Sequence, residues 1–269
     1  MLSNRESGRH ATDLAGLGLV RVKANNVYVT QLSGSIQRGV NVATAGDTLN
    51  VDAGNFTGED ITVGKALTLL GAQRGVIATG STRTGGETMI QGTGNSSSII
   101  MAVQSSNVTV DGFKINMAGS TRDGINVRLA NVSKPGNSSI GAYIENVTLR
   151  NNWIYHSSST ATTINGVLFG ESTLNALQTV VAEMANVTMS NNYIDMMSTN
   201  ASTGPRAVIL TSHFRTGGLD YTNFVITGNT IMGSYQTLGM MQYGKQRMMG
   251  ATISNNTFAN SHSGPSLPT

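Results

Sequence analysis

A nine-residue phrase recurs five times between the middle and the end of the chain. Its first copy reads Asn-Val-Thr-Val-Asp-Gly-Phe-Lys-Ile, and the third reads Asn-Val-Thr-Met-Ser-Asn-Asn-Tyr-Ile. The copies begin at Asn107, Asn146, Asn186, Asn223 and Gly250, at intervals of 39, 40, 37 and 27 residues. A strand-turn-strand unit repeated in this way buries its apolar face only by stacking on the next unit. The repeat therefore predicts an all-β solenoid.

Each repeat has room for about three strands. A second apolar stretch follows the phrase, as in 124–129, 166–169, 207–210 and 238–243, and one tight turn lies inside the phrase itself. Asparagine tolerates the left-handed backbone conformation that such turns need, and equivalent asparagines on adjacent coils can stack as a hydrogen-bonded ladder. We expect a structural ladder from the asparagines at this turn: Asn151, Asn152, Asn191, Asn192, Asn229, Asn255 and Asn256.

A short amphipathic helix precedes the first coil. Ile36, Val40 and Ala43 share one helical face, and Ser33 or Ser35 can serve as the N-cap. A helix within 34–44 would cover the open end of the solenoid core. The predicted organisation is a lead-in with a first strand (1–32), a solenoid body of stacked β-coils that includes this helix (33–260) and a tail (261–269).

Composition excludes several function classes. Charged residues make up 12% of the chain, and the formal net charge is +3 without any run of basic residues, so nucleic acid is not an expected partner. The chain has no cysteine, which removes disulfides and thiolate metal sites. No apolar run approaches the roughly 20 residues of a membrane span. Residues 1–10 are polar, so the signal for an exported protein would lie outside this chain.

Two early segments carry a family resemblance. Residues 35–56 read Ser-Ile-Gln-Arg-Gly-Val-Asn-Val-Ala-Thr-Ala-Gly-Asp-Thr-Leu-Asn-Val-Asp-Ala-Gly-Asn-Phe, and 61–72 read Ile-Thr-Val-Gly-Lys-Ala-Leu-Thr-Leu-Leu-Gly-Ala. They resemble the opening of right-handed parallel β-helix proteins of the pectin-lyase-like superfamily, and the later phrases resemble that family's generic repeats. The resemblance covers about 33–260 and implies a right-handed parallel β-helix with a short N-terminal capping helix. It does not select an activity, because the superfamily includes lyases, hydrolases, epimerases, esterases, tailspikes and adhesive surface proteins.

Residues for catalysis are sparse. A lyase of this fold would carry clustered acidic Ca²⁺ ligands and a basic Arg or Lys, whereas the 14 acidic residues here are spread thinly. A polygalacturonase-like hydrolase would need two or three carboxylates together. The segment Arg122-Asp123-Gly124-Ile125 only faintly resembles that family's Asn-Thr-Asp-Gly phrase. The outward positions of the second strands are largely apolar in either alternation phase. The weak catalytic candidates are Asp123, Arg128, Arg206, His213 and Arg215.

Two hypotheses follow. The first is a non-catalytic extracellular or cell-surface module, with a structural, adhesive or self-associating role. The alternative is a polysaccharide-acting enzyme (a lyase, hydrolase or epimerase) whose site lies in loops beside the second-strand sheet. No cofactor is expected, and Ca²⁺ only under the alternative. The expected partners are polysaccharide or a second copy of the chain, which would associate through the last coil (238–258), because exposed strand edges invite pairing.

Overall fold

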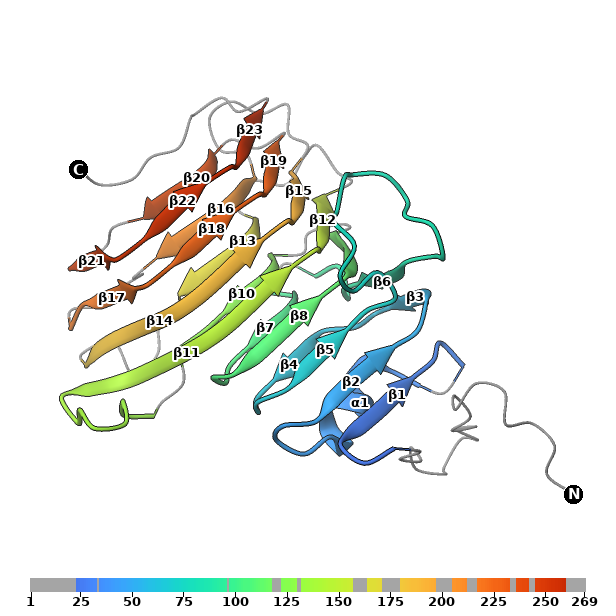
Figure 1. The fold of residues 1–269 in the computed structure, drawn as a ribbon, viewed down its shortest axis with the longest axis horizontal. Helices are drawn as coiled ribbons and strands as arrows, with labels where there is room; N and C mark the ends of the chain where they lie inside the picture. Colours follow the sequence, from blue (N-terminus) through green and yellow to red (C-terminus); the bar gives the residue numbers. More distant parts are fainter. Residues whose placement is uncertain are drawn as a thin grey trace, which may run out of the picture.

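The computed structural model describes residues 23–32, 34–95, 97–117, 122–129, 132–156, 164–170, 180–196, 205–211, 217–232, 236–241 and 245–259. Within these ranges the chain forms three parallel β-sheets and one helix, α1 (Ile36–Val42). The chain passes through the three sheets in turn and advances by one strand position per coil (Figure 1). The predicted right-handed parallel β-helix with a small N-terminal helix is confirmed.

Sheet A is the longest sheet. It contains, in spatial order, β1 (Asn26–Val29), β2 (Thr48–Val51), β5 (Thr68–Leu70), β8 (Val108–Asp111), β11 (Ile140–Arg150), β14 (Val181–Ser190), β17 (Leu219–Thr222) and β21 (Gln246–Met249), with β18 (Val225–Thr227) and β22 (Thr252–Ser254) continuing the last two coils.

Sheets B and C complete each coil. Sheet B contains β3 (Gly54–Thr57), β6 (Thr88–Gln91), β9 (Phe113–Met117), β12 (Trp153–His156), β15 (Tyr193–Asp195), β19 (Thr230–Met232) and β23 (Thr257–Ala259). Sheet C contains β4 (Ile61–Val63), β7 (Ile99–Val103), β10 (Asp123–Val127), β13 (Asn165–Gly170), β16 (Arg206–Thr211) and β20 (Gln236–Met241). The inward side chains of all three sheets form one continuous apolar core.

Helix α1 lies against the N-terminal end of this core. Its N-cap is Ser35, whose hydroxyl accepts a hydrogen bond from the Arg38 N–H, and it packs on β1, β2 and β4. Gly39 permits the close approach, because a Cβ there would lie 2.5 Å from Val29 and 2.7 Å from Leu49. The carboxylate of Glu59 accepts a hydrogen bond from the Ile36 N–H at 2.9 Å. An acidic group at a helix N-terminus compensates unpaired N–H groups, so Glu59 joins the cap to the first coil.

The asparagines of the tight turn between sheets A and B divide into two sets. Asn151, Asn191 and Asn255 have φ between 54° and 57°, the left-handed conformation that asparagine tolerates. The residues that follow them form the ladder: the side-chain amide of Asn152 donates to Asn192, that of Asn192 to Asn229, and that of Asn229 to Asn256, at 2.9–3.1 Å. The ladder therefore uses one asparagine per coil, and the other sets the backbone.

The first residue of each phrase is also at a left-handed position. Asn107, Asn146, Asn186 and Asn223 have φ between 53° and 60°, and Gly250 takes this place in the last copy with φ of 65°. This position is therefore occupied in every copy by asparagine or glycine, two residue types that adopt positive φ at low cost. This constraint explains why the phrase begins with asparagine or glycine.

Candidate functional site

The structure brings two of the catalytic candidates into one row. Asp123 begins β10 and Arg206 begins β16, and both pair in register with Asn165, which begins β13 between them. Arg128 follows the other end of β10, where its N–H donates to the carbonyl of Val103. His213 and Arg215 lie outside the described residues.

Asp123 is the centre of a buried polar network. Its carboxylate is fully buried and accepts hydrogen bonds from the side-chain amides of Asn165 at 2.7 Å and Asn126 at 2.9 Å, and from Arg122 Nε at 3.3 Å. Burial raises its pKa, and the hydrogen bond from Asn165 and the charge of Arg122 oppose that rise. The amide oxygens of Asn126 and Asn165 are buried and have no hydrogen-bond partner in the described part of the chain. The carboxylate of this network is therefore not exposed to solvent.

The outward row of sheet C is not an open surface. Ile125, Val127, Val167 and Phe169 belong to the core, so the alternate positions face outward, and they include Asn126, Leu168 and Ile209. These three side chains are 0–2% exposed. The outward positions are largely apolar, as the sequence indicated, but at these positions they are buried, which side-chain alternation alone does not reveal.

Sheet B carries the most distinctive outward side chains. Position eight of the phrase is Lys114, Trp153 and Tyr193 in successive copies, and these residues are register neighbours on β9, β12 and β15. The next outward row contains Asn116, Tyr155 and Asp195. All six side chains are half-buried. We call this set of six residues the aromatic face.

The rings of the aromatic face contact one another and a cation. Trp153 lies with its centroid 5.4 Å from that of Tyr155 and 6.4 Å from that of Tyr193, the latter pair nearly perpendicular at 88°. The Lys114 ammonium lies 3.8 Å from the Trp153 centroid and 5.3 Å from the Tyr155 centroid. Burial lowers the pKa of Lys114 and raises the pKa of Asp195. One cation and one carboxylate thus accompany three rings on a compact surface.

The connection between β5 and β6, residues 71–87, borders this face. In Figure 1 it is the teal loop that extends beside β6 and β12. The Ala78 N–H donates to the carbonyl of Asn191, and the Arg83 guanidinium donates to the carbonyl of Asn151 and to the carboxylate of Glu87. These bonds fasten the loop to the turns that precede Trp153 and Tyr193. A Cβ on Gly80, which has φ of +77°, would lie 2.3 Å from the Tyr193 ring, so glycine allows the loop to contact this ring.

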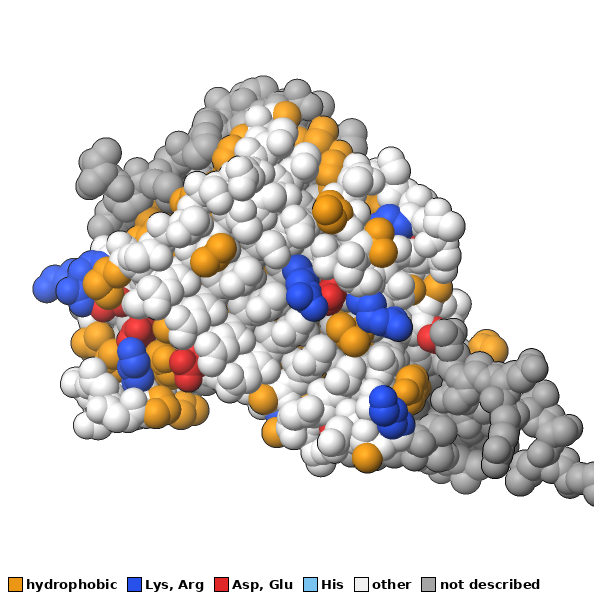
Figure 2. Space-filling model, viewed as in Figure 1, with side chains coloured by type: hydrophobic (Ala, Val, Ile, Leu, Met, Phe, Trp, Pro, Cys, Tyr) orange, Lys and Arg blue, Asp and Glu red, His pale blue; other side chains and the backbone are white. Residues whose placement is uncertain are grey.

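The face drawn in Figure 2, over sheet A, has a different character. It is mostly uncharged, with scattered charged side chains rather than a basic patch. One outward row is nearly all threonine: Thr48, Thr68, Thr109, Thr148, Thr188 and Thr252, with Val225 between the last two. Charges on this row are absent, whereas sheet B combines rings, a cation and a carboxylate.

Among the described residues, no three His, Cys, Asp or Glu side chains are grouped closely enough to hold a metal ion. In that part of the chain, no helix has the length and apolarity to cross a membrane.

Sequence reasoning missed the aromatic face, although its signal was present. The phrases were aligned by their shared residues, which are the turn and core positions. Position eight varies from Lys114 to Trp153, Tyr193, Thr230 and Thr257. Comparing the variable position across copies would have placed a lysine, a tryptophan and a tyrosine in one outward row.

Comparisons with known proteins do not identify a family for this chain. No family model matches the chain, and no curated protein matches it. Among solved structures, an alginate lyase from Paenibacillus sp. str. FPU-7 is similar over 90% of this chain and 99% of its own, with 13% sequence identity and a TM-score of 0.25. A superposition this loose carries no argument about activity.

Proposed function

We propose that this protein is a non-catalytic extracellular module that binds polysaccharide through the aromatic face of sheet B. The observation that carries the proposal is the grouping of Trp153, Tyr155 and Tyr193 on adjacent strands, with ring centroids 5.4 and 6.4 Å apart. Three half-buried rings held by a rigid sheet lose little conformational freedom on binding, which favours their use as contact surfaces.

The chemistry of the face suits sugar rings. The face of an aromatic ring carries partial negative charge, and the C–H groups of a pyranose carry partial positive charge and form an apolar surface. Hydroxyl groups at the sugar edge need donors and acceptors, which Asp195 and Asn116 supply beside the rings. The Asn116 side-chain oxygen is buried and has no hydrogen-bond partner in the described ranges, so a sugar hydroxyl that reached it would satisfy an acceptor.

The arrangement also suits a chain-like ligand. The outward rows of sheet B run along the solenoid axis, with neighbouring strands about 4.8 Å apart. Lys114, Trp153 and Tyr193 therefore present successive contacts along one line. A polysaccharide lying along this line would meet one side chain per coil. We place such a protein outside the cell, where polysaccharide ligands are found.

The chain contains one tryptophan, and it lies in this face, so its fluorescence reports on binding directly. We expect soluble polysaccharides from a panel of β-glucan, pectate and alginate to change Trp153 emission in a saturable way. Tyr193→Ala should weaken the affinity about tenfold, equivalent to about 1.4 kcal/mol. Tyr28→Ala, which removes a half-buried tyrosine on the outer side of sheet A, is the matched control and should leave affinity unchanged.

Two results would reject the proposal. One is the absence of a saturable emission change with every polysaccharide in the panel. The other is equal weakening by Tyr193→Ala and Tyr28→Ala, because general destabilisation would then explain the loss. Binding measured independently by affinity electrophoresis guards against ligands that bind without altering the indole.

A further inference from the structure

A pocket lies beside the first part of β11, which is longer than β8, the preceding strand of sheet A. Strand β8 begins at Val108, whereas β11 begins at Ile140 and pairs with β8 only from Val147 onward. The first part of β11 therefore extends beyond the edge of β8. A cavity of about 480 Å³ occupies this step, in the size range of ligand pockets. It is lined by residues of four connecting segments and β11: Ala45, Gly64, Lys65, Ala66, Gln104, Ser105, Ser106, Asn107, Val132, Pro135, Tyr143 and Glu145.

One edge of β11 is open toward this pocket. The Glu145 N–H donates to Ser106 Oγ at 3.0 Å, and its carbonyl accepts from the Asn107 N–H at 2.9 Å, so the main chain of Glu145 faces the N-terminal side of the sheet. Backbone groups in a strand alternate in direction with a period of two residues. The N–H and C=O of Tyr143 therefore face the same way.

Within the described residues, Tyr143 has a strand neighbour on one side only. It pairs in register with Glu183 of β14, while the pairing of β11 with β8 begins four residues later. The Ala182 N–H donates to Gly218, so Ala182 and its register partner Ala142 direct their main chain toward the C-terminal side. This leaves the N–H and C=O of Tyr143 at the unpaired edge. An unpaired strand edge in a cavity is a template for an added strand.

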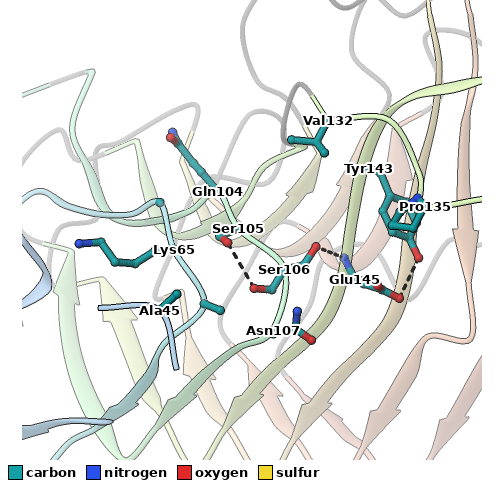
Figure 3. A pocket seen from close by; sticks show the side chains of 12 residues that line it. Ala45, Lys65, Gln104, Ser105, Ser106, Asn107, Val132, Pro135, Tyr143 and Glu145 are labelled. Atoms are coloured by element: carbon teal, nitrogen blue, oxygen red, sulfur yellow. Dashed lines mark hydrogen bonds between the residues drawn. The ribbon is translucent and has the colours of Figure 1, made fainter. Parts of the chain in front are cut away.

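The charged groups of the pocket are already engaged. The Lys65 ammonium donates to the carbonyls of Asn41 and Ala43 at 3.1 and 2.8 Å. The Glu145 carboxylate accepts from the Tyr143 hydroxyl at 2.8 Å. In Figure 3 the lysine lies on the opposite side of the pocket from Tyr143 and Glu145. Lys65 and Glu145 are the two charged side chains of the lining, and their opposite charges balance, so a neutral ligand suits this pocket better than a strongly charged one.

The remaining lining complements a main chain with small side chains. Val132 and Pro135 form an apolar wall beside Tyr143, and the polar side chains of Gln104 and Ser105 lie across from it (Figure 3). Strand addition uses main-chain hydrogen bonds for affinity and shallow pockets for alternate side chains. A single sugar ring would not supply the N–H and C=O groups at strand spacing that the Tyr143 edge requires.

We propose that this pocket binds a short extended peptide as an added strand on the open edge of β11. The peptide carbonyl on one side of a residue accepts from the Tyr143 N–H, and the peptide N–H on the other side donates to the Tyr143 carbonyl, as in a parallel ladder. Small neutral side chains pack on Val132 and Pro135. This site is separate from the aromatic face and does not depend on polysaccharide binding.

The test uses the neutral peptide N-acetyl-Ala-Ala-Ala-N-methylamide and saturation-transfer NMR on the whole protein. We expect saturation transfer to the peptide, and its loss when the amide nitrogens of all three alanines are methylated, because methylation removes the N–H groups that a ladder needs. Gly64→Leu should abolish the signal, since a Cβ at Gly64 meets open space and the larger side chain would fill the pocket. Ala45→Leu blocks the same pocket from a different segment, and Thr57→Leu on the exposed side of β3 is the control that should retain binding.

Trp153→Ala should leave the peptide signal intact, which separates this site from the proposed polysaccharide site. The inference is overturned if the peptide gives no signal, if the methylated peptide binds equally well, or if both pocket-filling variants keep full binding while circular dichroism shows an unchanged fold. It is also overturned if N-acetylglucosamine binds in a manner blocked by Gly64→Leu while the peptide does not.

Discussion

The ammonium group of Lys114 lies 3.8 Å from the centre of the Trp153 ring, on the neighbouring strand of sheet B. A cation over an indole is attracted by the ring's negative face, a contact worth about 0.5–2 kcal/mol. The lysine therefore shields one face of the protein's single tryptophan while the Tyr193 ring lies perpendicular to it. The position of the Lys114 side chain therefore determines how accessible this face of the Trp153 indole is to solutes.

We predict that Lys114→Met increases collisional quenching of Trp153 emission by acrylamide, because methionine lacks the charge that holds the side chain over the indole. The Stern–Volmer constant is the measured quantity. Lys65→Met, a lysine at the pocket on another part of the solenoid, is the control. An unchanged quenching constant in Lys114→Met would mean that the lysine does not screen the ring in solution.

Asn192 is an interior residue of the asparagine ladder, with a ladder neighbour on both sides. Its amide donates to the carbonyl of Leu149 and to Asn229, and its oxygen accepts from the N–H and amide of Asn152. Asn192→Ala leaves several buried groups unpaired, at about 1–3 kcal/mol for each. We expect the free energy of unfolding in urea to fall by at least about 2 kcal/mol. Asn256→Ala, at the half-buried end of the ladder, should cost less. Equal costs would contradict a ladder whose strength depends on burial.

Asp123 makes a pH-dependent contribution to stability. Because burial raises its pKa above the ordinary value of 3.8, the folded state holds the proton more tightly than the unfolded chain. Stability from this group is therefore greatest at low pH and is lost as the pH rises from about 4 toward the raised value. We expect Asp123→Asn to flatten the pH dependence of the unfolding free energy above about pH 4. Asp220→Asn removes the same formal charge as a control, and a slope unchanged by Asp123→Asn would refute the assignment.

The final coil is predicted to mediate self-association. In the described part of the chain, strands β20, β21 and β23 end their sheets, and Met249 on β21 is 41% exposed, so backbone edges and apolar side chains lie together. Light scattering should show dimers or larger species at high concentration. Met249→Lys should shift the protein toward monomer, whereas Val181→Lys, at a position 40% exposed on β14, should not. A wild-type protein that stays monomeric at high concentration would disprove this prediction.

We predict that pectate and alginate are not cleaved. Unsaturated products of β-elimination would absorb in the ultraviolet, and we expect no increase with or without Ca²⁺. The decisive contrary result is turnover that Arg128→Ala or Arg206→Ala abolishes while the fold is retained. Turnover lost instead in Asp195→Asn would place an enzyme site on the aromatic face, because burial raises the pKa of this carboxyl and a raised pKa suits a general acid.

The fold was predictable because every coil repeats the same sequence requirements. A coil must place apolar side chains inward and a left-handed residue at each sharp turn, so Asn107, Asn146 and Asn186 recur with the same neighbours. The helix 34–44 was predictable for a similar local reason: one apolar face and a serine N-cap. Strand β3 was missed because Gly54–Thr57 contains one buried apolar residue, Phe56, among polar ones.

The candidate sites depend on contacts between coils, which the sequence does not repeat. Asp123 was interpreted as a weak catalytic candidate, and in the structure it accepts a buried hydrogen bond from Asn165, 42 residues later. The contact of Gly80 with Tyr193 joins a loop to a strand three coils away. The pocket beside Tyr143 arises because consecutive coils differ in strand length. Such contacts depend on which residues of neighbouring coils pair with each other. The segments between phrases differ in length, so this pairing cannot be counted off along the sequence.

The asparagine ladder also makes the coils interchangeable. Asn229 offers Asn192 the same acceptor, at 2.9 Å, that Asn192 offers Asn152 at 3.1 Å. Asn192 and Asn229 each have an equivalent asparagine on both sides, so a duplicated or deleted coil in this region would find matching bonds on both sides of the join. Such a chain can change length in whole coils without redesign of its interior. Gene segments of about 40 codons, rather than single residues, are the steps in which relatives of this protein should differ in length.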